Sequence, residues 1–283
     1  MRKHLPTLLL IAVLIAGLCI FMYPLASDYW NSMVQGRASV DYEAALSNLT
    51  HKGYTEAFET ARAYNAALRE IDFPPADHDQ LDERGDLPRY EDILNVNGNG
   101  VMGYISIPKI GVELPICHGT ETSALNIAAG HLEGTSLPVG RESTHCVLSA
   151  HRGLPSAKLF TDLDEMAVGD VFTITVLDQA LMYEVDQIKV VEPNEVDDLY
   201  VIEGEDYCTL VTCTPYGINT HRLLVRGTRI ETTGNKSTVY ARADAVLIDE
   251  LIVVSFLAML MLLVWVAFLL VRFCKKRGEK EEK

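Results

Sequence analysis

The hydrophobic positions of this chain form two long uncharged runs, with shorter periodic stretches between them. The runs cover residues 5–26 and 251–271. At a rise of about 1.5 Å per residue, a helix over either run is long enough to cross a hydrocarbon core of roughly 30 Å. We therefore predict a transmembrane helix near each end of the chain, which excludes a simple soluble protein.

The charges beside the two runs predict how the chain is oriented. Two basic residues precede the first run, and four follow the second within residues 272–277. Because basic flanks stay on the cytoplasmic side, we expect a two-pass protein of the cell membrane with both termini cytoplasmic and an extracellular segment between the runs. The first run has an alternative interpretation as a cleaved signal peptide, because Pro24-Leu25-Ala26 resembles a weak cleavage site.

The segment between the runs changes from helical to alternating periodicity. Residues 39–70 are Ala-rich with apolar positions at helical spacing, which predicts one or two amphipathic helices. Residues 71–90 are Pro-rich and acidic, a loop composition. The sequence YEDILN, residues 90–95, predicts a short helix before the Asn-Gly turn at residues 97–100.

Beyond that turn, short stretches with a period of two predict β-strands. Their spacing and the turn residues between them favour a mainly β fold, a closed barrel or a sandwich, over βαβ units. The predicted strands are Val101–Ile107, Cys146–Ala150, Val171–Leu177, Met182–Val191, Tyr207–Cys213 and Arg222–Glu231.

Composition locates the charge in the extracellular segment. The 283 residues include 39 acidic and 24 basic side chains, for a formal net charge of −15, although 48% of the residues are hydrophobic. Subtracting the charges of the two ends leaves about −18 for residues 27–248. Because an acidic surface repels phosphate, we expect no nucleic-acid partner.

The cysteines do not form a disulfide framework. Of six, Cys19 lies in the first apolar run and Cys274 lies just beyond the second, so four remain in the extracellular segment. None has CxxC spacing, and no His/Cys cluster has metal-ligand spacing. We therefore predict neither a metal nor an organic cofactor, and leave open a bridge between Cys117 and Cys146.

Cys213 is the candidate nucleophile. It ends the apolar stretch YCTLVTC and precedes a Pro-Gly loop, which predicts a thiol at a barrel rim. Arg222 opens the next strand, so a hairpin brings it beside Cys213. A guanidinium there stabilises a thiolate, or the oxyanion that forms when a thiolate attacks a carbonyl.

His151 is the candidate general acid and base. It follows another predicted strand and can supply the proton that a leaving amine needs. Spacing alone leaves His145 and His221 as competing bases. It also leaves Cys213 as a possible small core residue, the usual role of cysteine. Cys208 lies five positions earlier, so alternation puts it on the opposite face of its strand from Cys213.

Four segments resemble one protein family. TLVTCTPYGINTHRLLVRG (209–227) is similar to the TLxTC…R signature of the sortases, which are Gram-positive cell-surface transpeptidases. GVMGYISIPKIGVELPICHGT (100–120), HLEGTSLPVG (131–140) and THCVLSAHRGLPSAKLFTDL (144–163) resemble the class C, pilus-assembling branch. The likeness extends over about residues 92–231.

The resemblance implies a closed sortase-type β-barrel and assigns its residues. Cys213 is then the nucleophile, His151 the general acid and base, and Arg222 the stabiliser of substrate or oxyanion, while His145 and His221 are flanking residues. The implied reaction cleaves an LPxTG-like sorting signal and joins pilin subunits through the amine of a Lys. Two alternatives are a sortase that attaches surface proteins to cell-wall peptide, and a non-catalytic membrane-anchored adhesin or scaffold.

The domain boundaries follow from these expectations. We predict an N-terminal transmembrane helix (1–26), a helical segment with a possible lid loop (27–90), a catalytic barrel (91–248), a C-terminal transmembrane helix (249–271) and a basic cytoplasmic tail (272–283). Class C sortases usually carry a lid with an Asp-Pro-aromatic motif. Residues 72–90 contain Asp72-Phe73-Pro74 and Asp86-Leu87-Pro88 instead, neither in that order, so no lid residue is assigned a function.

Overall fold

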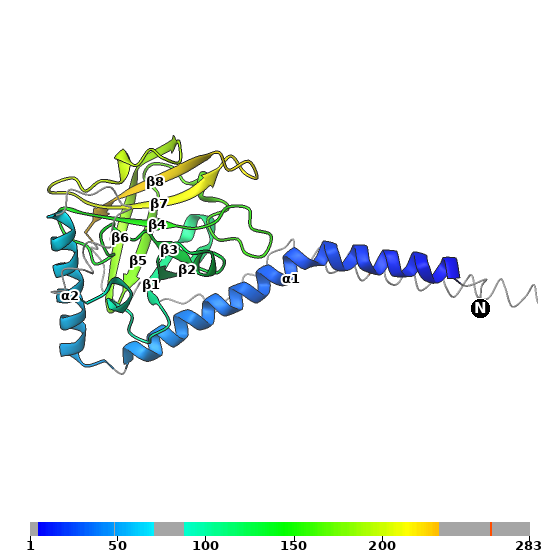
Figure 1. The fold of residues 1–283 in the computed structure, drawn as a ribbon, viewed down its shortest axis with the longest axis horizontal. Helices are drawn as coiled ribbons and strands as arrows, with labels where there is room; N and C mark the ends of the chain where they lie inside the picture. The colour runs from blue at the N-terminus through cyan, green and yellow to red at the C-terminus, as the bar shows by residue number, and fades with distance from the viewer. Residues whose placement is uncertain (1–4, 48, 71–87, 232–260, 262–283) are drawn as a thin grey trace, which may run out of the picture. The chain divides into compact units, whose positions relative to one another are not determined.

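The computed structural model describes residues 5–47, 49–70, 88–231 and 261. Eight strands close into one barrel in the order β1-β2-β3-β4-β7-β8-β6-β5 (Figure 1). The strands are β1 (Val101–Ile107), β2 (Val112–His118), β3 (Ala129–His131), β4 (Thr144–Ser149), β5 (Val171–Val176), β6 (Gln179–Val191), β7 (Asp206–Thr214) and β8 (His221–Ile230). The prediction of a mainly β fold is confirmed, and the barrel is the correct choice over the sandwich.

The barrel has two parallel strand pairs among otherwise antiparallel ones. β2 pairs with β3 and β4 pairs with β7 in parallel. The β4–β7 pair joins segments about 60 residues apart, with Ser149 opposite Val211. This pairing brings the end of β4 to the end of β7, where the candidate catalytic residues lie.

Two strands were absent from the predicted set. β2 contains Pro115, which lacks a backbone donor and usually argues against a strand inside a sheet. β3 has only three residues, including Gly130. β3 is fully buried, and most of β2 is buried, so tertiary packing overrides their weak local propensity.

Side chains that alternate along the strands fill the barrel interior. Ile105, Leu148, Phe172, Leu210 and Val225 are fully buried and belong to one continuous hydrophobic core. On β4, β7 and β8 the residues between these core positions face outward. The outward residues therefore form a surface separate from the core, and this surface carries the candidate site.

The helices begin and end at other residues than the sequence predicts. α1 (Leu5–Ser47) is one continuous helix of 43 residues that joins the first apolar run to the start of the Ala-rich segment. α2 (His51–Arg69) follows and packs on the barrel through Phe58, Ala61, Tyr64 and Leu68. The YEDILN segment forms only one 3₁₀ turn, η2 (Tyr90–Asp92).

Further 3₁₀ turns and one short helix lie in the connections. They are η3 (Pro108–Ile110), α4 (Thr122–Leu125), η4 (Leu163–Glu165) and η5 (Asp197–Leu199).

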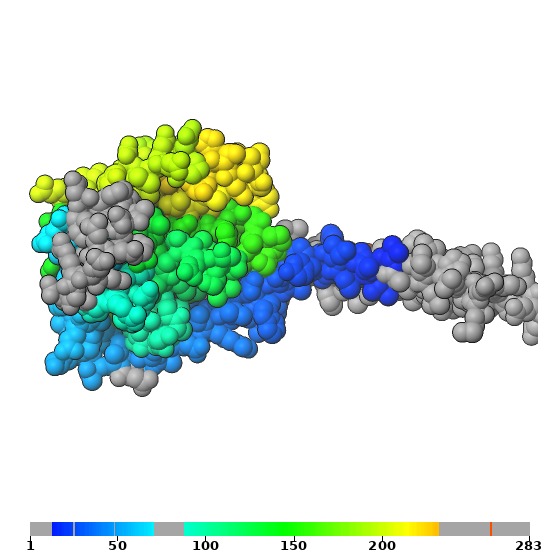
Figure 2. Space-filling view, viewed as in Figure 1, coloured from blue at the N-terminus to red at the C-terminus, as the bar shows by residue number. Residues whose placement is uncertain are grey.

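α1 is attached to the barrel at its C-terminal half. Tyr42 is fully buried, its hydroxyl donates to the Met102 carbonyl at 2.9 Å, and the Leu177 amide donates to it at 2.9 Å. The first half extends away from the barrel surface (Figure 2), and Phe21 there is 65% exposed. Among the described residues, α1 alone is long and apolar enough to cross a membrane, over Val13–Ser47. Apart from residue 261, the predicted second span lies outside the described residues.

Candidate active site

Cys213 and Arg222 are neighbours across two strands. They are directly opposite each other in the antiparallel ladder of β7 and β8, next to the pair Thr214 and His221. Opposite residues in such a ladder project from the same face, with Cβ atoms about 5 Å apart. The predicted hairpin neighbourhood is confirmed, with a loop of residues 215–220 between the strands.

His151 reaches the same place along β4. The Ala150 amide donates to the Val211 carbonyl at 3.1 Å, and the Thr212 hydroxyl donates to the Ala150 carbonyl at 2.8 Å. These bonds continue the β4–β7 pairing past the last ladder residue and bring His151 to the level of Cys213. The His151 carbonyl accepts from the Phe160 amide at 3.1 Å, which fixes its backbone on the other side.

Cys213, His151 and Arg222 line one groove of about 520 Å³. All three side chains are half-buried, so they are accessible from the groove. The structure therefore brings together the three residues that the sequence analysis selected. A thiol, an imidazole and a guanidinium in one groove are sufficient for acyl transfer through a thioester.

The floor of this groove is apolar. Val147, Leu199 and Leu224 are buried in a second hydrophobic cluster, separate from the barrel core. Val147 and Leu224 lie two or four positions from the candidate residues on their own strands, so alternation puts them on the same outer face. Leu132, Val191, Val196 and Val211 pack around them. The groove can therefore bury an apolar peptide segment beside the thiol.

Arg152, to which the sequence analysis assigned no role, links the segment after β4 to the end of β7 and the loop that follows it. Its guanidinium donates to the Thr214 hydroxyl at 3.2 Å and forms an ion pair with Asp164. It also lies over the ring of Tyr216, 6.0 Å from the centroid. The side chain is only 9% exposed. Its position next to His151 was visible in the sequence, but its contacts depend on residues about 12 and 62 positions away.

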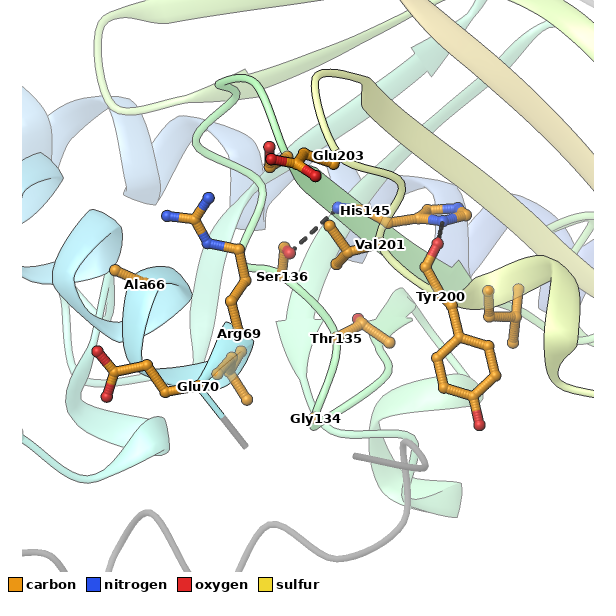
Figure 3. Close-up of a pocket in the computed structure, with 13 residues that line it drawn as sticks. Ala66, Arg69, Glu70, Gly134, Thr135, Ser136, His145, Tyr200, Val201 and Glu203 are labelled. Carbon is orange, nitrogen blue, oxygen red and sulfur yellow. Dashed lines mark hydrogen bonds between the residues drawn. The ribbon is translucent and has the colours of Figure 1, made fainter. Parts of the chain in front are cut away.

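The competing histidine His145 has a structural role. It lies beside a different cavity, lined by the end of α2 and by Thr135 and Tyr200 (Figure 3). Its Nδ1 lies 2.9 Å from the Tyr200 carbonyl, so Nδ1 carries the proton, and the Thr209 hydroxyl then donates to Nε2 at 2.7 Å. Both ring nitrogens are occupied, and burial lowers the pKa of His145. It does not line the groove.

His221, the other competitor, is opposite Thr214 at the start of β8. Its Nδ1 lies 2.9 Å from the hydroxyl of its neighbour Thr220. It does not belong to the lining of the Cys213 groove. The geometry therefore favours His151 over both alternatives.

The other cysteines of the barrel lie away from the groove. Cys146 and Cys208 are opposite each other in the β4–β7 ladder and buried in the barrel core. The predicted opposite orientation of Cys208 and Cys213 is thus confirmed. Cys117 is a free thiol on β2, and burial raises its pKa to about 11. Cys117 and Cys146 are both free, so the bridge left open between them does not form.

No metal site is evident in the parts of the chain that the structure describes, since no three His, Cys, Asp or Glu side chains there are grouped to hold an ion. The possible lid loop is largely outside the described residues, which resume at residue 88. Tyr90, its last residue, is buried, and its hydroxyl lies 2.9 Å from Nδ1 of His131.

Known proteins share this fold and sequence. The Sortase domain family model matches residues 105–230. Sortase C1 from Streptococcus agalactiae is 45% identical, with a TM-score of 0.64, covering 69% of this chain and 99% of that one. Sortase C from Streptococcus pneumoniae, whose structure was described in connection with pilin substrate specificity, is 43% identical with a TM-score of 0.60, covering 70% and 99%.

A more distant relative is sortase D from Bacillus subtilis, which is 28% identical over 131 residues, 45% of this chain. The chain spans 63% of the length of that protein. A closed eight-stranded barrel with a cysteine, a histidine and an arginine in one groove, together with these likenesses, defines the class. The chain belongs to the sortase family of cysteine transpeptidases, and its similar solved structures belong to class C of that family.

Proposed function

We propose that this protein is a membrane-anchored transpeptidase that cleaves LPxTG-like sorting signals and joins pilin subunits through Lys isopeptide bonds. The observation that carries the proposal is the shared groove of Cys213, His151 and Arg222, with Cys213 opposite Arg222 in the β7–β8 ladder. No other described cysteine lines this groove.

The first half-reaction forms a thioester. The thiolate of Cys213 attacks the carbonyl carbon of the Thr in the sorting signal, and the carbonyl oxygen becomes an oxyanion. Arg222 stabilises this charge, since its guanidinium presents several donors on the same face as the thiol. When the C–N bond breaks, His151 gives a proton to the departing Gly amine.

The second half-reaction transfers the acyl group. A Lys amine attacks the thioester carbon, His151 takes a proton from that nitrogen, and Cys213 leaves as the thiolate. The products are an isopeptide bond and the free enzyme, so no metal or redox step is needed. An amine is a stronger nucleophile than water, so hydrolysis is the slower outcome.

The apolar floor of the groove supports a substrate with an apolar segment. Val147, Leu199 and Leu224 can bury the Leu and Pro side chains of an LPxTG-like signal, and each well-buried aliphatic side chain is worth about 2 kcal/mol. The thiol lies at the edge of this floor. A peptide bound there presents the bond after its apolar residues to Cys213.

Two observations support pilins as the substrates. The similar Streptococcus pneumoniae enzyme was described in connection with pilin substrate specificity. The extracellular segment carries a net charge of about −18, which attracts a Lys-bearing partner surface. We propose a Lys amine of a second pilin as the acceptor for these reasons.

We further propose the two-pass topology. α1 supplies the N-terminal span, and the uncharged run at residues 251–271 supplies the second, followed by the basic tail. The barrel then lies on the extracellular side, where membrane-tethered substrates arrive. A variant that keeps Cys274 of the tail as its only cysteine tests this topology with a membrane-impermeant thiol reagent, because labelling of Cys274 in intact cells contradicts it.

The proposed function is tested with Cys213→Ala in cells that display the cognate pilin. High-molecular-weight pilin ladders should disappear, while Cys117→Ala, which removes a thiol outside the groove, should leave them intact. Ladders that persist in Cys213→Ala contradict the proposal. Purified wild-type protein given a pilin and a wall-peptide amine in competition distinguishes the two sortase functions, because preference for the wall peptide favours the anchoring alternative.

A further inference from the structure

The membrane-proximal part of α1 contacts the loop that follows His151. The side-chain amide of Asn31 donates to the Ser156 carbonyl at 2.6 Å, and the Lys158 amide donates to Oδ1 of Asp28 at 2.9 Å. Asp28 and Asn31 are one helical turn apart and therefore lie on one face of α1. Both are half-buried, which agrees with a packed contact.

The contacted loop is itself tied to His151. The Phe160 amide donates to the His151 carbonyl at 3.1 Å, and the Gly153 amide donates to the Thr161 hydroxyl at 3.1 Å. Phe160 is fully buried in the barrel core. The end of the loop is therefore hydrogen-bonded to its beginning, so a displacement of residues 156–158 also moves the backbone of His151.

Without α1, the middle of this loop has fewer restraints. Ser156 is half-buried and Lys158 is exposed, although the Lys158 ammonium donates to the Ile110 carbonyl and pairs with Asp162. These remaining contacts hold the side chain of Lys158. The Thr161 amide also donates to the Lys158 carbonyl at 2.9 Å, and Ala157 and Leu159 are buried in the barrel core. The Ser156 carbonyl and the Lys158 amide are held by the two bonds from α1.

We propose that Asp28 and Asn31 are positioning residues for the transpeptidase reaction: they clamp the loop at Ser156 and Lys158 and so hold His151 against the Cys213 groove. The inference rests on the proposed function. In this proposal α1 helps to orient the His151 imidazole, in addition to anchoring the protein. Because neither Asp28 nor Asn31 lines the groove, the clamp affects turnover and leaves substrate binding unchanged.

The experiment uses the full chain in phospholipid nanodiscs with an LPxTG-like peptide and an amine acceptor. Asp28→Ala and Asn31→Ala, singly and together, should lower kcat by roughly 10-fold to 100-fold with KM within about twofold, since small displacements of catalytic groups cost rates of this order. The double variant should also exchange the Phe160 amide hydrogen faster. Folding should persist, because Tyr42 still attaches α1 to Met102 and Leu177.

Two matched variants separate positioning from general damage. Asp28→Asn keeps an acceptor for the Lys158 amide and should restore wild-type kcat. Ser32→Ala removes a hydroxyl on the same helix that donates to the Tyr29 carbonyl, within α1 itself, and should leave kcat, KM and the Phe160 exchange rate unchanged. An unchanged kcat in the double variant, a rise in KM alone, or an Asp28→Asn as slow as Asp28→Ala overturns the inference.

The same experiment distinguishes failure of the proposed function from failure of the proposed clamp. A wild-type chain without transpeptidase activity contradicts the proposed function. The Phe160 exchange rate still tests the clamp in that case, because unchanged exchange in the double variant contradicts it and faster exchange supports it.

Discussion

Cys213 and Arg222 are opposite each other in the β7–β8 ladder, one position from where the two strands separate into their loop. The proximity of their backbones is therefore set by the hydrogen bonds of the ladder, while the Arg222 guanidinium donates to the carbonyls of His221 at 3.1 Å and Asn219 at 3.4 Å. A ladder position also fixes the face from which each side chain projects. The ladder therefore places Arg222 beside the thiol, which agrees with the oxyanion role proposed for it.

Arg222→Lys tests that relationship. Lys keeps the charge but loses the planar set of donors, so kcat should fall by about 10²–10³, the usual effect of losing an oxyanion donor. The melting temperature should stay close to that of the wild type. Arg226→Lys is the control, because Arg226 binds Asp186 outside the groove and should affect turnover little. Wild-type turnover in Arg222→Lys removes Arg222 from the mechanism.

Thiol reactivity should single out Cys213 among the cysteines of the barrel. Cys213 is half-buried at the groove, whereas Cys208 is 0% exposed and Cys146 lies beside it in the core. Cys117 should react slowly at neutral pH, because its pKa of about 11 leaves little thiolate. Alkylation followed by peptide mass spectrometry measures all four. Equal rates at Cys213 and Cys208 would favour the non-catalytic scaffold.

Gly153 should be needed for activity because of its surroundings as well as its backbone angle. Its φ is +73°, and an added Cβ would lie 2.8 Å from the Tyr216 ring. Gly153→Ala should displace Tyr216 and the Arg152 contact, and lower kcat about 10-fold or more. Gly98→Ala is the control, since Gly98 has φ of +70° with open space around it.

Both alanine variants should lose about 1–2 kcal/mol of stability from the unfavourable backbone angle. Only Gly153→Ala should lose turnover. Equal activity in the two variants, measured in the same transpeptidation assay, would show that Tyr216 and Arg152 do not support the site.

His145 should make stability depend on pH. Burial lowers its pKa in the folded state, so the unfolded chain binds the proton more readily. The contribution of neutral His145 to the free energy of unfolding is therefore fully present above the unfolded pKa of about 6.5. It decreases as the pH falls from there toward the folded pKa. Urea unfolding at pH 8 and pH 5 measures this loss. His145→Asn should flatten the dependence, and an unchanged slope would assign it to other groups.

Local pattern was sufficient for much of the fold and for part of the site. Strand β1 has the predicted bounds, and the bounds of five other strands lie within three residues of the predicted ones. Apolar and polar residues alternate in these strands because one face of each is buried in a core. Alternation also predicted correctly that Cys208 and Cys213 lie on opposite faces of β7. The hairpin between residues 213 and 222 was predictable because short loops restrict register.

Contacts between distant segments were not predictable in this way. β2 and β3 are strands because neighbouring strands pair with them, although Pro115 and a three-residue length give weak local signals. The contacts of Arg152 with Asp164, Thr214 and Tyr216 likewise depend on the folded arrangement. The same holds for the contact of Asp28 with Lys158, 130 positions away.

The sequence by itself determined six of the eight strands, the acidic segment between the two apolar runs, and the choice of Cys213, His151 and Arg222 as candidate residues. It did so because these properties depend on residue type and short-range periodicity. The tertiary structure decided that β4 pairs with β7 in parallel, which brings His151 to Cys213, and that α1 reaches the loop behind His151. These depend on which distant surfaces bury each other, and that is set by packing of the whole barrel.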